Sequence, residues 1–276
     1  MQLSFFFVAA ACKFDLITDF AGGLNFIALA VLSLVDGGHY HTRQIVASAI
    51  VIACRAELGL FLLFRVCKRG KDARFDEIRE KFFAFLTFWI FQMVWVWGVS
   101  MALVFINYDD ADPDWEARDT VGATMAILGF LLQVVADFQK YSFRANPDNK
   151  GKFCDVGLWK VSRHPNFFGE MLIWWGIFVM ATPVFKPSSE DWGWATITSP
   201  LLTMVILLFG SGMPSAEGSN LNRFLKTSES ADRYYTYRKR TPILIPFVPS
   251  LYAMLPQWVK VVLCFEFPFY EPKPQR

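Results

Sequence analysis

The chain has 276 residues, of which 54% are hydrophobic and 17% aromatic, and its mean hydropathy is +0.32. A soluble domain of this length needs a smaller fraction of apolar residues to fill its core, so the composition indicates a membrane protein. The formal net charge is only +2, and no basic helix is interleaved with stacking aromatic residues, so nucleic acid is not an expected partner. The five cysteines have no paired spacing, which argues against a disulfide framework and a zinc site.

Hydrophobic segments dominate the chain from its first residues. Residues 3–11 follow no basic segment, so we expect a short hydrophobic lead-in rather than a cleaved signal. Six longer segments follow, most of about 19–25 residues, which suffices to cross a hydrocarbon core of roughly 30 Å. They are 14–35, 44–67, 82–106, 120–138, 166–185 and 194–214. A seventh segment, 251–267, is broken by Pro256 and carries Lys260 and Glu266. We expect it to lie in the membrane interface, a short span being the alternative.

The segments between the spans alternate in charge. Those at 68–81, 139–165 and 215–250 are rich in Lys and Arg, whereas 107–119 is acidic and 36–43 and 186–193 hold one basic residue each. The positive-inside rule therefore places the three basic segments on the cytoplasmic side. The sequence predicts an all-α, multi-span membrane helix bundle of six to seven transmembrane helices, forming a single membrane domain over residues 1–276.

Ionisable residues inside the spans usually face a cavity or each other. Glu57 has two interpretations: an ion pair with Arg55 or Arg65, or a proton donor that orients a carbonyl in a substrate pocket. Asp15 and Asp19 lie near a span end and fit the interface. The other polar residues in the spans include Gln92, Gln133 and Asp137.

The most informative stretch is 157–170, which leads directly into the fifth span. Pro165 suits the first turn of a helix, where its missing N–H costs nothing. Asn166 and Glu170 then lie four residues apart on one helical face. Glu170 can simply compensate the helix dipole, but that does not explain why Arg163, His164 and Asn166 gather at the start of the same span. An anionic, polar cofactor is the partner that these groups favour.

Two further elements carry matching chemistry. Asp137, Lys140 and Arg144 have helical spacing at the end of the fourth span, and Lys with Arg suits a nucleotide phosphate, although topology alone also explains basic residues there. Arg223 and the segment 233–247, which contains Tyr237, combine aromatic and basic residues. They can stack on a cofactor ring or form a belt at the lipid headgroups.

Residues 157–176, with Ser162 to Glu170 at their centre, resemble the C-terminal module of the steroid 5-alpha-reductase family. The residues Asp137, Gln139, Lys140, Phe143 and Arg144 upstream, and Tyr237, Thr241, Pro242, Ile245, Pro246 and Phe247 downstream, are similar in kind and spacing. The group Arg65, Gly70, Lys71, Asp72, Arg74 and Phe75 is typical of the little-characterised membrane branch of that family.

The resemblance implies a membrane reductase that binds NADPH from the cytosol and reduces a carbon–carbon double bond conjugated to a carbonyl in a lipid-like substrate. It implies a reductase-like module at 137–250. Asn166 and Glu170 match cofactor-contacting positions, Asp137 and Arg144 the nucleotide loop, and Arg223 and Tyr237 the closing segment. Arg65 and Lys71 are weaker matches, and Lys140, Arg163 and His164 complete the expected cofactor-binding set. Glu57 is the candidate catalytic acid. The tyrosine expected near Leu62–Phe64 is missing, which leaves the substrate open.

Two other functions share these features. One is an S-adenosylmethionine-dependent membrane methyltransferase of the isoprenylcysteine carboxyl methyltransferase type, which lacks the acid found here at Glu170. The other is a non-catalytic sterol- or lipid-binding membrane protein. A metal site is not expected, because His39 and His41 beside Asp36 are too few ligands for closed zinc. The expected location is the endoplasmic reticulum in a eukaryote or the inner membrane in a bacterium, with membrane lipids as neighbours; the sequence does not indicate an oligomeric state.

Overall fold

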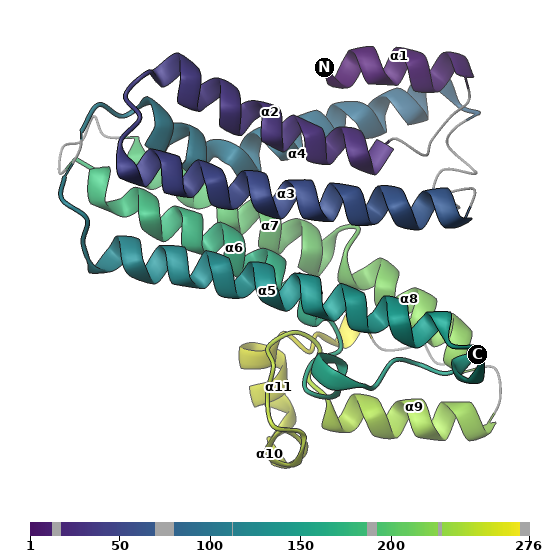
Figure 1. Cartoon of the computed structure of the whole chain (residues 1–276). Coiled ribbons are helices and arrows are strands. Elements are labelled where there is room, and N and C mark those ends of the chain that lie inside the picture. Colours follow the sequence, from purple (N-terminus) through teal and green to yellow (C-terminus); the bar gives the residue numbers. More distant parts are fainter. Residues whose placement is uncertain (13–17, 70–79, 112, 187–191, 226–227, 271–276) are drawn as a thin grey trace. The chain divides into compact units, whose positions relative to one another are not determined.

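The computed structural model describes residues 1–12, 18–69, 80–111, 113–186, 192–225 and 228–270. Every regular element in these ranges is a helix, which confirms the all-α fold class (Figure 1). The α-helices are α1 (Gln2–Cys12), α2 (Thr18–Gly37), α3 (Thr42–Arg69), α4 (Phe82–Tyr108), α5 (Ala117–Ala145), α6 (Pro165–Ala181), α7 (Thr198–Phe209), α8 (Met213–Phe224), α9 (Ser228–Arg240), α10 (Pro249–Met254) and α11 (Gln257–Cys264).

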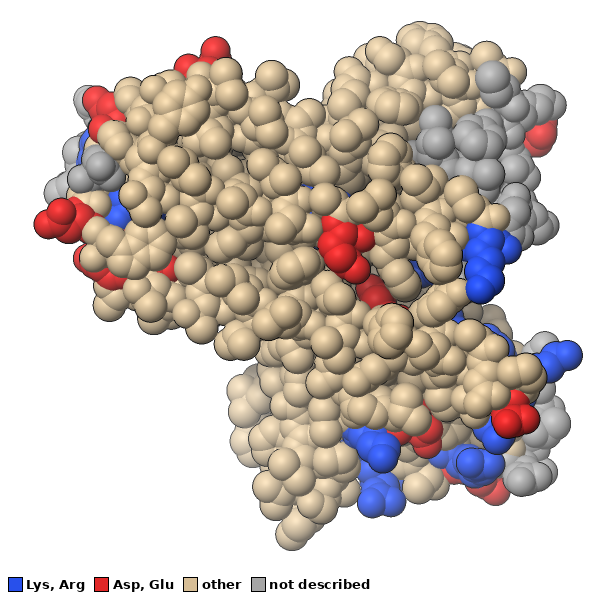
Figure 2. Space-filling model, viewed as in Figure 1, with Lys and Arg blue, Asp and Glu red and all other residues tan. Residues whose placement is uncertain are grey.

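Six of the helical segments are long and apolar enough to cross a membrane, as predicted. Their outer faces carry large exposed apolar side chains such as Trp97 and Phe138, which only lipid can cover. Figure 2 shows how much of the visible surface bears neither acidic nor basic side chains. The six segments are Phe20–Gly37, Thr42–Lys68, Phe82–Tyr108, Ala117–Ala145, Pro165–Val184 and Gly193–Phe224.

The seventh segment folds as two short helices. Helix α10 ends before Pro256 and α11 begins after it, with eight residues in α11. At about 1.5 Å per residue, α11 is roughly 12 Å long and cannot cross a bilayer. The segment 215–250, expected as a basic connection, also folds largely into helices, α8 and α9.

The contacts of the chain divide it into two compact units where the sequence led us to expect one domain. Unit 1 comprises Met1–Ile127 and Trp174–Leu202, and unit 2 comprises Leu128–Ile173 and Thr203–Arg276. Helices α5 and α6 contribute residues to both. Unit 1 buries an apolar core between α2, α3, α4 and the second half of α6. Unit 2 holds most of the segment 137–250 that the sequence singled out.

Glycine pairs let α5 and α6 approach closely. In unit 2, a Cβ placed on Gly169 would lie 2.5 Å from the carbonyl oxygen of Gly129, and a Cβ on Gly129 would lie 2.5 Å from that of Gly169. In unit 1, Gly122 and Gly176 make the same contact at 2.6 and 2.5 Å. Only glycine fits such a backbone contact, as at other close helix crossings in membranes. On each of the two helices the glycines are seven residues apart, that is, two turns.

Gly169→Ala should therefore destabilise the protein. The added methyl group meets backbone atoms, which cannot move aside as a side chain can, so we expect a loss of about 1–3 kcal/mol in the free energy of unfolding. The matched control is Gly218→Ala in α8, where a Cβ meets nothing within 4 Å. That change should raise stability by roughly 0.5–1 kcal/mol, since alanine is the better helix former. Unfolding in mild detergent, followed by circular dichroism, measures both; equal effects would contradict a close crossing.

Candidate functional site

Helix α6 begins at Pro165, as predicted, and this places Asn166 and Glu170 against α5. The Asn166 side-chain amide donates to Asp137 Oδ1 at 3.0 Å. One turn further into the helix, the Gln133 amide donates to Glu170 Oε2 at 3.2 Å. We call these four residues the amide–carboxylate seam. It lies beside the Gly129–Gly169 contact, which fixes the distance between the two helices.

The two carboxylates determine how the two amides of the seam are oriented. A carboxylate accepts hydrogen bonds only, so each amide must turn its NH₂ group toward its acid and its C=O group elsewhere. Asn166 Oδ1 and Gln133 Oε1 are both buried and, within the described part of the chain, accept no hydrogen bond. A buried acceptor without a donor costs free energy, so a bound water or a ligand that donates to these atoms would stabilise the fold. The seam thus offers two acceptors to a molecule that carries N–H groups.

A second set of contacts surrounds Trp159, which lies in the 3₁₀ turn η3 (Gly157–Lys160). Its ring N–H donates to the carbonyl of Ala136 at 2.9 Å, and the Lys140 ammonium lies 4.0 Å from its ring centroid. Its own carbonyl accepts a hydrogen bond from Tyr237 at 2.6 Å. Trp159 therefore brings two predicted cofactor residues, Lys140 and Tyr237, to one place. Burial raises the pKa of Tyr237 well above its ordinary value, so the phenol stays a neutral donor.

Arg163 and His164 are buried in a network of charges instead of lining an open surface. The Arg163 guanidinium donates to Glu217 of α8 at 2.7 Å and also to Glu266. Burial alone would lower its pKa, but the charges of the two carboxylates outweigh that effect and raise it. Tyr252 donates to the other oxygen of Glu266 at 2.8 Å, and Arg238 lies 3.5 Å from Glu217.

His164 joins the same network through its Nε2, which lies 2.7 Å from Glu217 Oε1. Burial lowers the pKa of this imidazole. Because a carboxylate only accepts, Nε2 carries the proton and Nδ1 is left as an acceptor. The ring stacks on Phe167 with an interplanar angle of 9°. The network holds the turn before α6 in place, and so positions Asn166 and Glu170.

Sequence reasoning missed the partners that make this network. Glu217 lies beyond the end predicted for the sixth span, at 214, but α8 continues to Phe224 and buries it. For Glu266 the sequence indicated only a charged residue in the seventh segment, with no partner. Glu266 lies between two phenylalanines, which is a usable signal, because a carboxylate in such surroundings needs a cationic partner.

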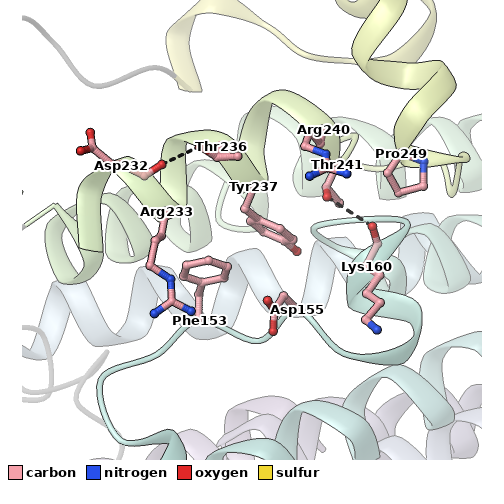
Figure 3. Close-up of a pocket in the computed structure, with 10 residues that line it drawn as sticks. All are labelled: Phe153, Asp155, Lys160, Asp232, Arg233, Thr236, Tyr237, Arg240, Thr241 and Pro249. Atoms are coloured by element: carbon pink, nitrogen blue, oxygen red, sulfur yellow. Dashed lines mark hydrogen bonds between the residues drawn. The ribbon is translucent and has the colours of Figure 1, made fainter. Parts of the chain in front are cut away.

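Unit 2 also contains a cavity of about 540 Å³ between α9 and the loop that follows α5 (Figure 3). Tyr237 is the one residue of its lining that was predicted to bind a cofactor. Thr241 donates to the Lys160 carbonyl at 3.2 Å, which ties the end of α9 to η3. The lining consists of Phe153, Asp155, Lys160, Asp232, Arg233, Thr236, Tyr237, Arg240, Thr241 and Pro249.

The remaining predicted residues are not members of the seam. Arg144 is exposed at the end of α5, and Arg223 is exposed at the end of α8, over the Phe224 ring at 5.4 Å. Glu57 and Arg65 belong to α3 in unit 1, where Glu57 is half-buried. Lys71 and Asp15 lie outside the described residues.

Unit 1 encloses a buried cation of its own. Arg55 is 3% exposed, and its guanidinium carbon lies 5.3 Å from the Phe26 ring centroid and 5.5 Å from that of Trp174. Two aromatic faces can stabilise a cation away from water. Among the described residues, no group of three or more potential ligands could hold a metal ion, and His39 and His41 stack on each other at 5.7 Å.

The chain belongs to the protein family described as "Protein of unknown function (DUF1295)", which matches residues 5–241. Among curated proteins and among solved structures, none matches the chain. The family match ends at Thr241, so Glu266, which pairs with Arg163, and Tyr252, which donates to Glu266, both lie beyond it.

The charge network predicts a large effect for Glu266→Gln. The substitution keeps the shape of the side chain but leaves Arg163 short of one negative charge, so we expect the free energy of unfolding to fall by about 3–5 kcal/mol. Glu116→Gln is the control, since it breaks an ion pair to Arg118 whose side chains are 42% and 53% exposed. That change should cost less than about 1 kcal/mol. Denaturation in mild detergent compares the two; a Glu266→Gln protein as stable as the control would contradict the role of the network.

Proposed function

We propose that this protein is an NADPH-dependent membrane reductase, related to steroid 5-alpha-reductases, which reduces a carbon–carbon double bond conjugated to a carbonyl in a lipid-like substrate. The observation that supports it best is the amide–carboxylate seam. Residues that resemble the cofactor contacts of that family come from two segments of the sequence, and they meet there with two acceptors left free.

The free acceptors fit the reactive end of this cofactor. Nicotinamide carries a carboxamide, whose NH₂ group has two donors and whose oxygen is an acceptor. Asn166 Oδ1 and Gln133 Oε1 need such donors, and no hydrogen-bond donor among the described residues serves them. Asp137 and Glu170 accept from the NH₂ groups of both side-chain amides, so the C=O groups of these amides point away from the acids. These residues would therefore hold the nicotinamide, and their orientation is set before the ligand arrives.

Basic residues one to two turns further along α5 suit the phosphates. The Lys140 ammonium lies 4.0 Å from the centroid of the Trp159 ring, and this contact holds the cation at the end of α5. Arg144 is exposed at the helix end, where a two-pronged guanidinium can reach an anion. Both side chains belong to a segment that the positive-inside rule assigns to the cytosol, the compartment in which NADPH is available.

Bound NADPH would supply a hydride to the β-carbon of the enone, and a proton delivered to the α-carbon from an acid or from water would complete the reduction. The chain's own part is to orient the carboxamide through Asn166 and Gln133, exclude water, and stabilise the charge that grows on the substrate carbonyl oxygen. Glu57 remains the candidate for that last role.

Binding measurements test the cofactor site. Gln133→Leu removes one acceptor for the carboxamide and Glu170→Ala removes the group that orients it, so each should raise the Kd for NADPH roughly tenfold. Gln257→Leu, at an exposed position in α11, is the matched control and should bind as the natural protein does. NADPH fluorescence on the purified protein gives the affinities.

Three outcomes of that experiment would contradict the proposal. They are no binding of NADPH at all, unchanged affinity in Gln133→Leu, or loss of affinity in the control. Thermal stabilisation by S-adenosylmethionine but not by NADPH would favour the methyltransferase instead, because only a ligand of the folded state shifts unfolding.

Turnover tests the role of Glu57. With a panel of lipid-soluble enones, Glu57→Gln should lower kcat about 100-fold, as the loss of one general acid does, and leave the affinity for NADPH unchanged. If Glu57 serves only in an ion pair, the substitution lowers thermal stability instead and spares kcat. Full turnover in Glu57→Gln would remove this residue from the reaction.

A further inference from the structure

The cavity of unit 2 is built from one face of α9. Arg233, Thr236, Tyr237, Arg240 and Thr241 recur at the three- and four-residue intervals of a helix, so their side chains share a face. The two arginines are seven residues apart, which separates them by about 10 Å along the axis. On the opposite wall Phe153 packs against Tyr237, with ring centroids 4.9 Å apart.

Charged residues of both signs line this cavity without neutralising each other. Lys160, Arg233 and Arg240 are basic and Asp155 and Asp232 are acidic, and all five side chains are exposed. Within the described part of the chain, none of the five side chains makes an ion pair or a hydrogen bond with another residue. A ligand that carries both a cation and an anion would pair with both signs at once.

Asp155 and Arg240 lie at different places in the cavity. Figure 3 shows Asp155 on the loop wall between Phe153 and Lys160, opposite Tyr237. A carboxylate beside aromatic rings is a favourable site for an ammonium group. Arg240 lies with Thr241 at the end of the cavity near Pro249 (Figure 3), and a guanidinium there suits a phosphate.

Pro249, the first residue of α10, connects the cavity to an apolar surface. From Phe247 to Leu263, large side chains point outward, including Met254 at 79% and Trp258 at 68% exposure. Over α10 and α11 the single charged residue is Lys260, which lies over the Tyr252 ring. Exposed apolar side chains in this number are unfavourable in water, and tryptophan is a typical anchor at the membrane interface.

We propose that the cavity binds a zwitterionic phospholipid of the surrounding membrane, such as phosphatidylethanolamine. Its ammonium group pairs with Asp155 against Phe153 and Tyr237, its phosphate pairs with Arg240, and its acyl chains lie along α10 and α11. The argument is independent of the proposed reductase function, since the seam contributes no residue to the lining of this cavity.

Native mass spectrometry of the purified full-length protein in mild detergent can count the lipids that it retains. Dioleoyl-phosphatidylethanolamine is the probe, and dioleoyl-phosphatidylglycerol, which carries a phosphate but no amine, is its comparison. The natural protein should retain the first about fivefold better, the size expected for one exposed ion pair.

Charge-neutralising variants assign the contacts. Asp155→Asn should lower retention of the ethanolamine lipid about fivefold and raise that of the glycerol lipid, because it removes an attraction in one case and a repulsion in the other. Arg240→Gln should weaken both lipids. The matched controls are Asp148→Asn and Lys239→Gln, exposed residues outside the cavity lining, and both should leave retention unchanged.

Several results would overturn the proposal. They are equal retention of the two lipids by the natural protein, an Asp155→Asn substitution that changes the retention of both lipids by the same factor, free phosphoethanolamine binding as tightly as the lipid, or displacement of the lipid by NADPH. The last result would assign the cavity to the cofactor and leave the proposed reductase intact. A protein that retains the lipid but never binds NADPH would refute the reductase and leave the lipid site standing.

Discussion

The positive charge of a guanidinium buried away from water must be neutralised by groups close to it. In unit 2, two carboxylates do this for Arg163. Its two carboxylates come from α8 and from the segment after α11, far away in the sequence. Because removing water from a charge is costly, these segments cannot detach without exposing an unpaired ion to a medium of low polarity. The turn before α6 is therefore held at the end of the helix that carries Asn166 and Glu170.

The close approach of α5 and α6 imposes a second constraint on the same residues. Glycine contacts bring the backbones so near that Gln133 and Asp137 on one helix reach Glu170 and Asn166 on the other. Rigid placement of this kind is what a ligand site needs, since little ordering remains to be done when the ligand binds. It also explains why two amide oxygens can remain without donors: the stability of the crossing and of the network offsets their cost.

The two proposed ligand sites of unit 2 differ in shape and polarity. The seam is narrow, polar and buried within the helices, which suits a flat carboxamide. The cavity beside α9 is wider, carries charges of both signs and continues into the apolar surface of α10 and α11. The proposed reductase would gain from both, because a lipid held at the surface would fix the position of the protein relative to the headgroups.

The sequence by itself determined the helical class, the six spans, the start of α6 at Pro165 and the helical run from Asp137 to Arg144. Hydropathy, helix period and proline geometry are local properties, so they can be read without knowing the fold. Only the tertiary structure decided which partners these residues have. Arg163 and His164 were expected at a cofactor, and they are buried with Glu217, which lies 54 and 53 residues away. Lys140 was predicted to contact a phosphate, and the structure adds a contact between its ammonium and the Trp159 ring. Such pairings depend on which helices approach each other and at which turn, and no local pattern in one chain carries that information.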